Sequence, residues 1–193
     1  MKKVLFVDCT MREGSRTKEL ADAFFSALNS DYEVTHLKLD KEDLKPLSGE
    51  FFEDRQVLLK RRELNHPRFR YAHQFVEADM IVIAAPLWDL SFPALLKIYI
   101  ENVSVDGISF VATADGLKGT AKATDMVYLT TRGGFYTGDP MESALPQLAN
   151  LAVFFGVDHF HAVAADGMDV VGFDGAASLD EAKKKAAALA KEL

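Results

Sequence analysis

The stretch MIVIAAPLWDLSFPALLK, residues 80–97, decides the fold of this chain. It begins with the continuous apolar run Met80–Ala84, which is typical of a strand that is covered on both faces. A loop with the chain's only tryptophan follows, and Pro93 then stands at the first turn of a helix that we expect over Pro93–Val103. A buried strand that leads through a short loop into a helix is the repeating unit of a parallel sheet.

The same strand pattern recurs along the chain. Lys3–Val7 and Met126–Thr130 are short apolar runs, and Phe160–Ala164 is a further candidate strand. Glu33–Leu39 alternates between polar and apolar residues, which places it nearer an edge of the sheet. Together with residues 80–84, these runs predict a parallel five-stranded sheet.

Helical patterns lie between the predicted strands. Thr17–Leu28 carries an apolar stripe with helical spacing, Met141–Phe155 is a second helix, and Leu179–Leu193 is a third, with Ser178 as its N-cap. Right-handed crossovers place such helices on both faces of the sheet. The sequence therefore predicts an α/β fold, a three-layer, doubly wound single domain over residues 1–193.

The segment Phe51–Ala78 departs from this rhythm. It is charged and split by Pro67, so we expect two helices there and no strand. Its basic residues are Lys60, Arg61, Arg62, Arg68 and Arg70. We interpret them as a solvated helix face, with a cofactor phosphate as the alternative partner.

Composition limits the possible functions. Asp and Glu total 29 against 22 Lys and Arg, and the resulting net charge of −7 argues against a nucleic-acid partner. No apolar segment approaches the roughly 20 residues of a membrane helix, and the run before Asp8 is too short for a signal peptide. We expect a cytoplasmic protein without a membrane partner. The lone Cys9 is interpreted as a packed small side chain, and the histidines show no metal-ligand spacing.

Three loops that follow predicted strands carry the candidate site, because ligands of a doubly wound sheet bind beyond the carboxyl ends of its strands. The first loop, Asp8–Leu20, offers the hydroxyls of Thr10, Ser15 and Thr17, the charge of Arg16 and a helix N-terminus. Together these groups suit a phosphate. The alternative is that Ser15 is only an N-cap and that Arg16 lies in solvent.

The second and third loops suit a flat ligand. The second consists of Pro86, Leu87, Trp88, Asp89 and Leu90. Its backbone amides are free to donate to a ligand's edge, although Trp88 has the alternative role of a core anchor for the next helix. In the third loop, Thr130–Pro140, the pair Gly133 and Gly134 permits positive φ and close backbone approach to a ring, while Arg132 orients the loop or meets negative charge.

Four segments carry a resemblance to a known family. They are DCTMREGSRT (8–17), AAPLWDLSFPALLKIYIENVSVDGISF (84–110), YLTTRGGF (128–135) and FFGVDHFHAVAADGMD (154–169). The chain resembles the flavodoxin-like FMN-dependent NAD(P)H oxidoreductases, specifically the FMN-dependent NADH-azoreductase and quinone reductase group. The resemblance spans almost the whole chain and is strongest from Ile81 to Phe135. One departure is Ala112, which stands where the family usually has a tyrosine.

The resemblance implies a role for each loop. It implies that the FMN phosphate is bound by Thr10, Ser15, Arg16 and Thr17. Along the isoalloxazine it places Pro86, Leu87, Trp88, Asp89 and Leu90. At the pyrimidine end it places Thr131, Arg132, Gly133 and Gly134. The implied substrate pocket is lined by Trp88, Phe135, Tyr136 and Phe154, with core packing as the alternative for Phe154.

The resemblance also implies an activity. NADH or NADPH passes hydride to flavin N5, and a small quinone, azo or nitro aromatic acceptor then takes the electrons in a ping-pong cycle. The family assembles as a homodimer, for which the helix Pro93–Val103 is a candidate contact surface. A flavodoxin-like FMN electron carrier that serves a protein partner is the alternative function, since it would use the same loops.

Overall fold

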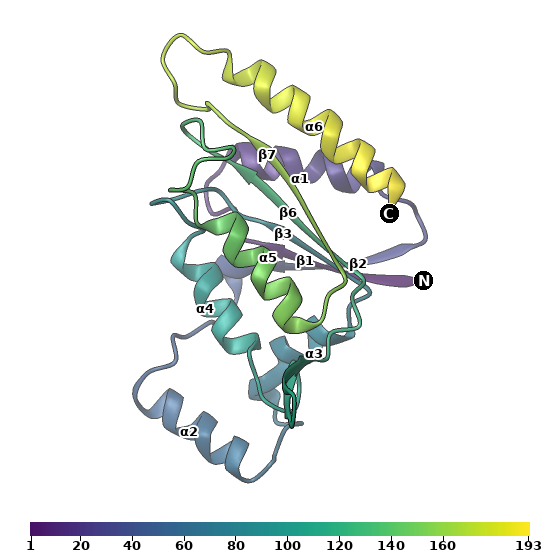
Figure 1. Cartoon of the computed structure of the whole chain (residues 1–193), viewed down its shortest axis with the longest axis vertical. Coiled ribbons are helices and arrows are strands. Elements are labelled where there is room, and N and C mark those ends of the chain that lie inside the picture. The colour runs from purple at the N-terminus through teal and green to yellow at the C-terminus, as the bar shows by residue number, and fades with distance from the viewer.

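The main sheet has five parallel strands in the order β2-β1-β3-β6-β7, in a computed structural model that describes all 193 residues (Figure 1). The strands are β1 (Lys2–Asp8), β2 (Tyr32–Lys38), β3 (Met80–Ala84), β6 (Asp125–Thr131) and β7 (His159–Ala165). Every strand lies within one residue of its predicted bounds, and β2 is an edge strand as its alternating pattern indicates. The doubly wound fold predicted from the sequence is confirmed.

Helices cover both faces of this sheet (Figure 1). On one face lie α1 (Arg16–Ala27) and α6 (Gly175–Glu192), and on the other α3 (Arg70–Glu77), α4 (Ala94–Val103) and α5 (Ala144–Phe155). Strand β3 feeds both cores because successive side chains of a strand point to opposite faces. Ile81 and Ile83 pack under α4 and α5, whereas Val82 packs under α1 and α6.

Two helices begin elsewhere than their sequence patterns suggest. Helix α5 starts at Ala144 rather than Met141, because Glu142 folds back and its carboxylate accepts a hydrogen bond from the Leu145 amide at 2.9 Å. Helix α6 starts at Gly175, one turn before the predicted start at Leu179. Asp174 is its N-cap, because the Asp174 side chain accepts a hydrogen bond from the Ala177 amide at 2.9 Å. Ser178 therefore lies inside the helix, where it does not cap.

The segment around Pro67 forms two helices and no strand, as predicted. They are α2 (Gly49–Lys60) and α3, with the short turns η1 (Leu39–Lys41) before them and η2 (Pro67–Phe69) between them. Helix α2 buries no residue and stands apart from the sheet (Figure 1). Of the basic residues, Arg68 lies over the Phe51 ring, 3.6 Å from its centroid, and Arg62 pairs with Asp106 at 3.3 Å.

A small hairpin was missed by the sequence reading. It consists of β4 (Phe110–Thr113) and β5 (Gly116–Gly119), which pair antiparallel. Gly119 presses against the end of α5, where an added Cβ would lie 1.9 Å from the backbone carbon of Phe155. The hairpin depends on this tertiary contact, which no local pattern shows. Among the helices, none is long and apolar enough to cross a membrane.

Candidate active site at the carboxyl edge of the sheet

The loop between β1 and α1 presents a row of unpaired backbone amides. None of the amide groups from Met11 to Thr17 donates a hydrogen bond within the chain. Ser15 is the N-cap of α1, and its hydroxyl accepts from the Lys18 amide at 3.3 Å. Free amide donors at a helix N-terminus attract anions, so the backbone of this loop suits a phosphate.

Two side chains of this loop hold it to other parts of the site. The Arg16 guanidinium donates to the Met168 carbonyl at 2.6 Å and to the Asp169 carboxylate at 2.8 Å, so it does not lie free in solvent. The buried hydroxyl of Thr17 lies 2.6 Å from that of Thr131. The first and third loops are therefore joined by a direct hydrogen bond.

A buried carboxylate lies beneath the first loop. Asp8 is fully buried, and its Oδ1 accepts from both the amide of Thr10 at 2.8 Å and the hydroxyl of Thr10 at 2.6 Å. His36 Nε2 lies 2.8 Å from Asp8 Oδ2, and Lys38 Nζ lies 3.3 Å from Oδ1. Burial acts to raise the pKa of Asp8, but the Thr10 and His36 hydrogen bonds and the charge of Lys38 lower it below its ordinary value. Asp8 is thus anionic at neutral pH.

The two residues after Asp8 face opposite ways. Cys9 is fully buried in the core beneath α4, and burial raises the pKa of its thiol to about 12, so it is a packed side chain as predicted. Thr10 lines a polar cavity of about 400 Å³ together with Ser15, His36 and Lys38. Of the two residues, Thr10 is therefore the one on the side of the loop cavity.

The second loop is a tight turn with an unusual backbone. Trp88 and Ser91 exchange backbone hydrogen bonds of 2.7 and 2.9 Å, while Asp89 and Leu90 have φ values of 49° and 66°. Two consecutive positive φ angles are typical of a type I′ turn, and a leucine there is strained. The amides of Asp89 and Leu90 donate no hydrogen bond within the chain, so they remain available to a ligand.

Neighbouring loops hold this turn in place. The Leu90 carbonyl accepts from the amide of Ser143 at 2.9 Å and from its hydroxyl at 2.8 Å, and the Leu87 amide donates to the Thr131 carbonyl at 3.1 Å. Trp88 is 38% exposed. Its side chain is therefore not the core anchor that was the alternative interpretation.

The third loop also carries unpaired amides, at Gly133, Gly134 and Phe135. Neither glycine has a positive φ, so the prediction that the pair permits positive φ angles is wrong. Glycine is needed for space instead: a Cβ on Gly133 would lie 2.8 Å from the Asp169 carboxylate, and one on Gly134 would lie 3.0 Å from the Tyr136 ring.

Arg132 holds the third loop from inside the protein. It is buried, and its Nη1 lies 3.3 Å from the Thr137 hydroxyl and 3.4 Å from the Asp166 carboxylate. Asp166 in turn accepts from the amides of Tyr136 and Thr137 at 3.2 and 2.9 Å. Because Asp166 compensates its charge, the geometry matches the orienting role among the two alternatives for Arg132.

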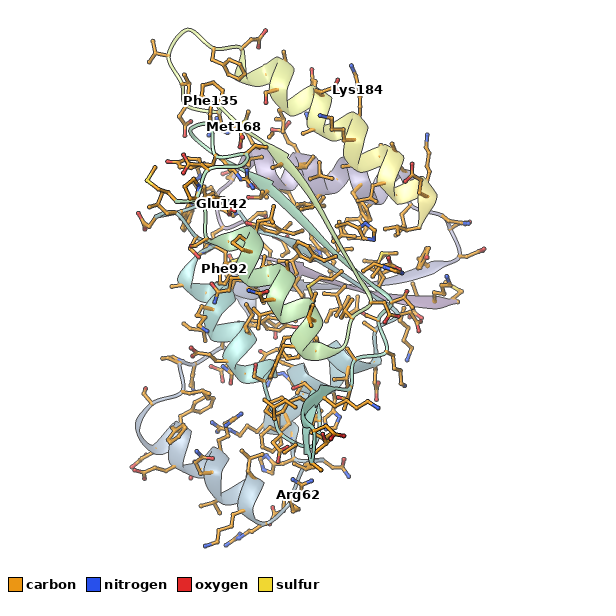
Figure 2. The ribbon with its side chains drawn as sticks, viewed as in Figure 1. Arg62, Phe92, Phe135, Glu142, Met168 and Lys184 are labelled. Carbon is orange, nitrogen blue, oxygen red and sulfur yellow. The ribbon has the colours of Figure 1, made fainter.

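The sequence reading missed a fourth segment, the loop between β7 and α6. Its amides donate to the third loop, from Gly167 to Gly134 at 2.9 Å, from Met168 to Arg132 at 3.0 Å and from Asp169 to Gly133 at 2.9 Å. Figure 2 labels Met168 and Phe135 at the same end of the molecule. The sequence DGMD at residues 166–169 indicates a turn after a predicted strand, but a turn pattern does not specify which segment the turn contacts.

The residues of the implied substrate pocket do not all come together. Trp88 and Phe135 are both exposed, and the rings of Phe135 and Phe173 pack edge to face with 4.9 Å between their centroids. Tyr136 lines a cavity of about 640 Å³ that the third loop shares with β7 and the start of α5. Phe154 lies at the far end of α5, 5.0 Å from the Phe110 ring, and within one chain it does not line the site. Its side chain packs against the hairpin, which matches the packing alternative for Phe154, and its place in a substrate pocket stays a prediction.

A family model described as a flavodoxin-like fold matches residues 2–190. The chain belongs to this flavodoxin-like family. Among curated relatives, the FMN-dependent NADH:quinone oxidoreductase of Clostridium beijerinckii is 38% identical, over 99% of this chain and 99% of its own length. A protein with the same description from Clostridium perfringens is 37% identical over 100% of both chains. Family members thus match the chain from end to end.

A solved structure agrees with this membership. The azoreductase from Bacillus anthracis str. Sterne superposes on the chain with a TM-score of 0.89. The two sequences are 26% identical, and the match covers 100% of each chain. The resemblance seen in the sequence is therefore confirmed, and the flavodoxin-like loops described above occupy the edge of the sheet where ligands of such folds bind.

Proposed function

We propose that this chain is an FMN-dependent oxidoreductase that passes electrons from NADH to a quinone or azo compound. The observation that carries the proposal is the set of unpaired amides on three loops at one sheet edge, at residues 11–17, 89–90 and 133–135. These are the donors that a planar cofactor with a phosphate at one end requires. Full-length similarity to relatives described as FMN-dependent NADH:quinone oxidoreductases supports the same conclusion.

Each loop has a part in holding the cofactor. The amides of residues 11–17 hold the phosphate, together with Ser15 and Thr17 at the start of α1. The amides of Asp89 and Leu90, which donate no hydrogen bond within the chain, would meet the polar edge of the ring system, and those of Gly133 and Gly134 would meet its pyrimidine end. Donors fixed at these places stabilise the negative charge that gathers on the ring when it is reduced. Arg16 and Arg132 act on the loops from behind, since both guanidinium groups contact other protein residues.

When bound, FMN supplies the redox chemistry, taking hydride from NADH at flavin N5 and giving two electrons to a quinone, azo or nitro aromatic acceptor. The protein contributes the positions in which the nicotinamide and the acceptor bind. Trp88 and Leu90 on the second loop and Phe135 on the third are exposed apolar side chains, which suit the flat faces of both the nicotinamide and an aromatic acceptor. Because the same exposed side chains would serve both, we infer that the nicotinamide and the acceptor bind in turn, in a ping-pong order.

We also propose a homodimer. Helix α2 buries no side chain within the chain. Its apolar residues Phe52 and Val57 are 39% and 45% exposed. Helix α4, over Ala94–Val103, is the candidate contact surface. Sedimentation measurements at several concentrations test the assembly, for which we expect a mass twice that of the 21.3 kDa chain.

The deciding experiment follows the flavin absorbance band of the FMN-reconstituted protein under anaerobic conditions. We expect NADH to bleach the band and a benzoquinone to restore it. Bound flavin that neither NADH nor NADPH reduces would favour the electron-carrier alternative. Initial rates at several fixed quinone concentrations then test the binding order, for which parallel double-reciprocal lines are expected, and azo and nitro compounds test the acceptor range.

A further inference from the structure

Lys38 reaches across from β2 to the backbone of the first loop. Strands β1 and β2 pair in a register that sets Lys38 beside Asp8, so its side chain extends along the carboxyl edge of the sheet. Its ammonium lies 3.3 Å from Asp8 Oδ1 and 3.3 Å from the Thr10 hydroxyl oxygen, and it also donates to the Thr10 carbonyl. A lysine ammonium has three donors, and here three acceptors meet them.

Asp8 creates a problem for an anion-binding loop. Its buried negative charge borders the same cavity as the loop residues Arg12–Ser15, whose amides are unpaired, and like charges repel more strongly away from bulk water. Thr10 does not relieve this, because its amide and its hydroxyl both donate to Asp8 and neither is free for a phosphate. His36 contacts the other carboxylate oxygen, but its side chain is 47% exposed. Lys38 is the permanent positive charge in contact with both Asp8 and Thr10.

We propose that Lys38 is a positioning residue for the cofactor phosphate: it neutralises Asp8 and fixes Thr10, and so allows the first loop to accept an anion. This inference rests on the proposed function. Lys38 does not bind the phosphate itself, since its donors are occupied by Asp8 and Thr10. Its nearest other charge, Asp40 at 3.6 Å, lies outside the loop and also pairs with Lys41.

The experiment compares the dissociation constants of FMN and riboflavin, which differ by the phosphate, for the full chain and for Lys38→Met. We expect the FMN constant to rise about tenfold, equivalent to roughly 1.4 kcal/mol, and the riboflavin constant to stay within about twofold. The matched control is Lys41→Met, which removes the same charge from a side chain that is 75% exposed on the following turn. We expect it to bind both flavins as the original chain does.

A double variant separates neutralisation from general damage. In Asp8→Asn/Lys38→Met the carboxylate charge is gone together with the lysine, so we expect FMN affinity to recover from the Lys38→Met value. An unchanged FMN constant in Lys38→Met, an equal loss for riboflavin, or no recovery in the double variant would each overturn the inference. Failure of the original chain to bind FMN would instead overturn the proposed function and this inference with it.

Discussion

At the scale of single residues, Asp8 combines burial with charge. Its lowered pKa means that the folded state favours the carboxylate more than the unfolded state does. The stabilisation is therefore fully present above the ordinary pKa near 3.8 and is lost as the pH falls below it toward the lowered folded value. Acid weakens the loop by protonating Asp8, which removes the acceptor charge that holds Thr10 and Lys38.

The Asp8→Asn variant tests this. We expect it to lower the free energy of unfolding by about 1–3 kcal/mol at pH 7, because hydrogen bonds to a charged group are lost. The difference from the original chain should shrink below about pH 4. Urea unfolding between pH 3 and 7 measures it, with Asp43→Asn as the control, since that carboxylate is 77% exposed. A difference that is constant across this range would contradict the assignment.

Cys9 gives a second prediction at this scale. Its thiol is buried and has a pKa raised to about 12, so the reactive thiolate is scarce and shielded from solvent. We expect an aromatic disulfide reagent at pH 8 to leave the folded chain unlabelled over the time in which it labels the urea-unfolded chain completely. Rapid labelling of the folded protein would show that the thiol is accessible.

At the scale of elements, the turn after β3 depends on its neighbours. A type I′ turn favours Asn, Asp and Gly at its central positions, yet Leu90 occupies one of them with a φ of 66°. The hydrogen bonds from Ser143 to the Leu90 carbonyl offset this strain. Strain retained at the turn that we propose contacts the cofactor favours a role there for the exposed Leu90 side chain.

Replacing Leu90 with glycine should relieve this strain. We expect Leu90→Gly to raise the free energy of unfolding by about 0.5–1 kcal/mol, since the left-handed penalty exceeds the entropy cost of glycine. Leu117→Gly is the matched control, because Leu117 is exposed on β5 without a positive φ, and it should destabilise the chain. Chemical denaturation measures both, and equal losses of stability for the two variants would argue against strain at Leu90.

The boundaries of helices and strands differ in how well the sequence predicts them. Strands β1, β3 and β6 were predicted to within one residue because a strand covered on both faces must be apolar throughout, as in residues 80–84. The start of α6 was placed one turn late because Ser178 and Asp174 are both good N-cap residues. Only the folded chain shows Ser178 donating to the Asp166 carbonyl at 2.8 Å.

At the scale of the whole molecule, the site joins segments from both halves of the chain. Thr17 meets Thr131, and Arg16 meets Asp169, so the first loop is tied to the two loops that follow β6 and β7. A ligand held by these loops connects strands that otherwise contact only their neighbours in the sheet. Binding should therefore stabilise the molecule as a unit.

Thermal unfolding with added cofactor tests this coupling. At an FMN concentration about 100 times the dissociation constant, we expect stabilisation of about 2.7 kcal/mol and a matching rise in Tm. Inorganic phosphate alone, at the same concentration, should give little change because we expect it to contact only the first loop. A Tm that does not respond to FMN would contradict a site shared among the loops.

The sequence by itself determined the five strands of the sheet, the apolar face of α1 and the three loops that we propose as the ligand site, because burial periodicity and turn chemistry act over a few neighbouring residues. The tertiary structure alone decided which loops contact each other. Lys38 lies 30 residues from Asp8 and Asp169 lies 153 residues from Arg16 along the chain. Such pairs form only after the strand order and register bring distant segments to one edge, so no local pattern encodes them.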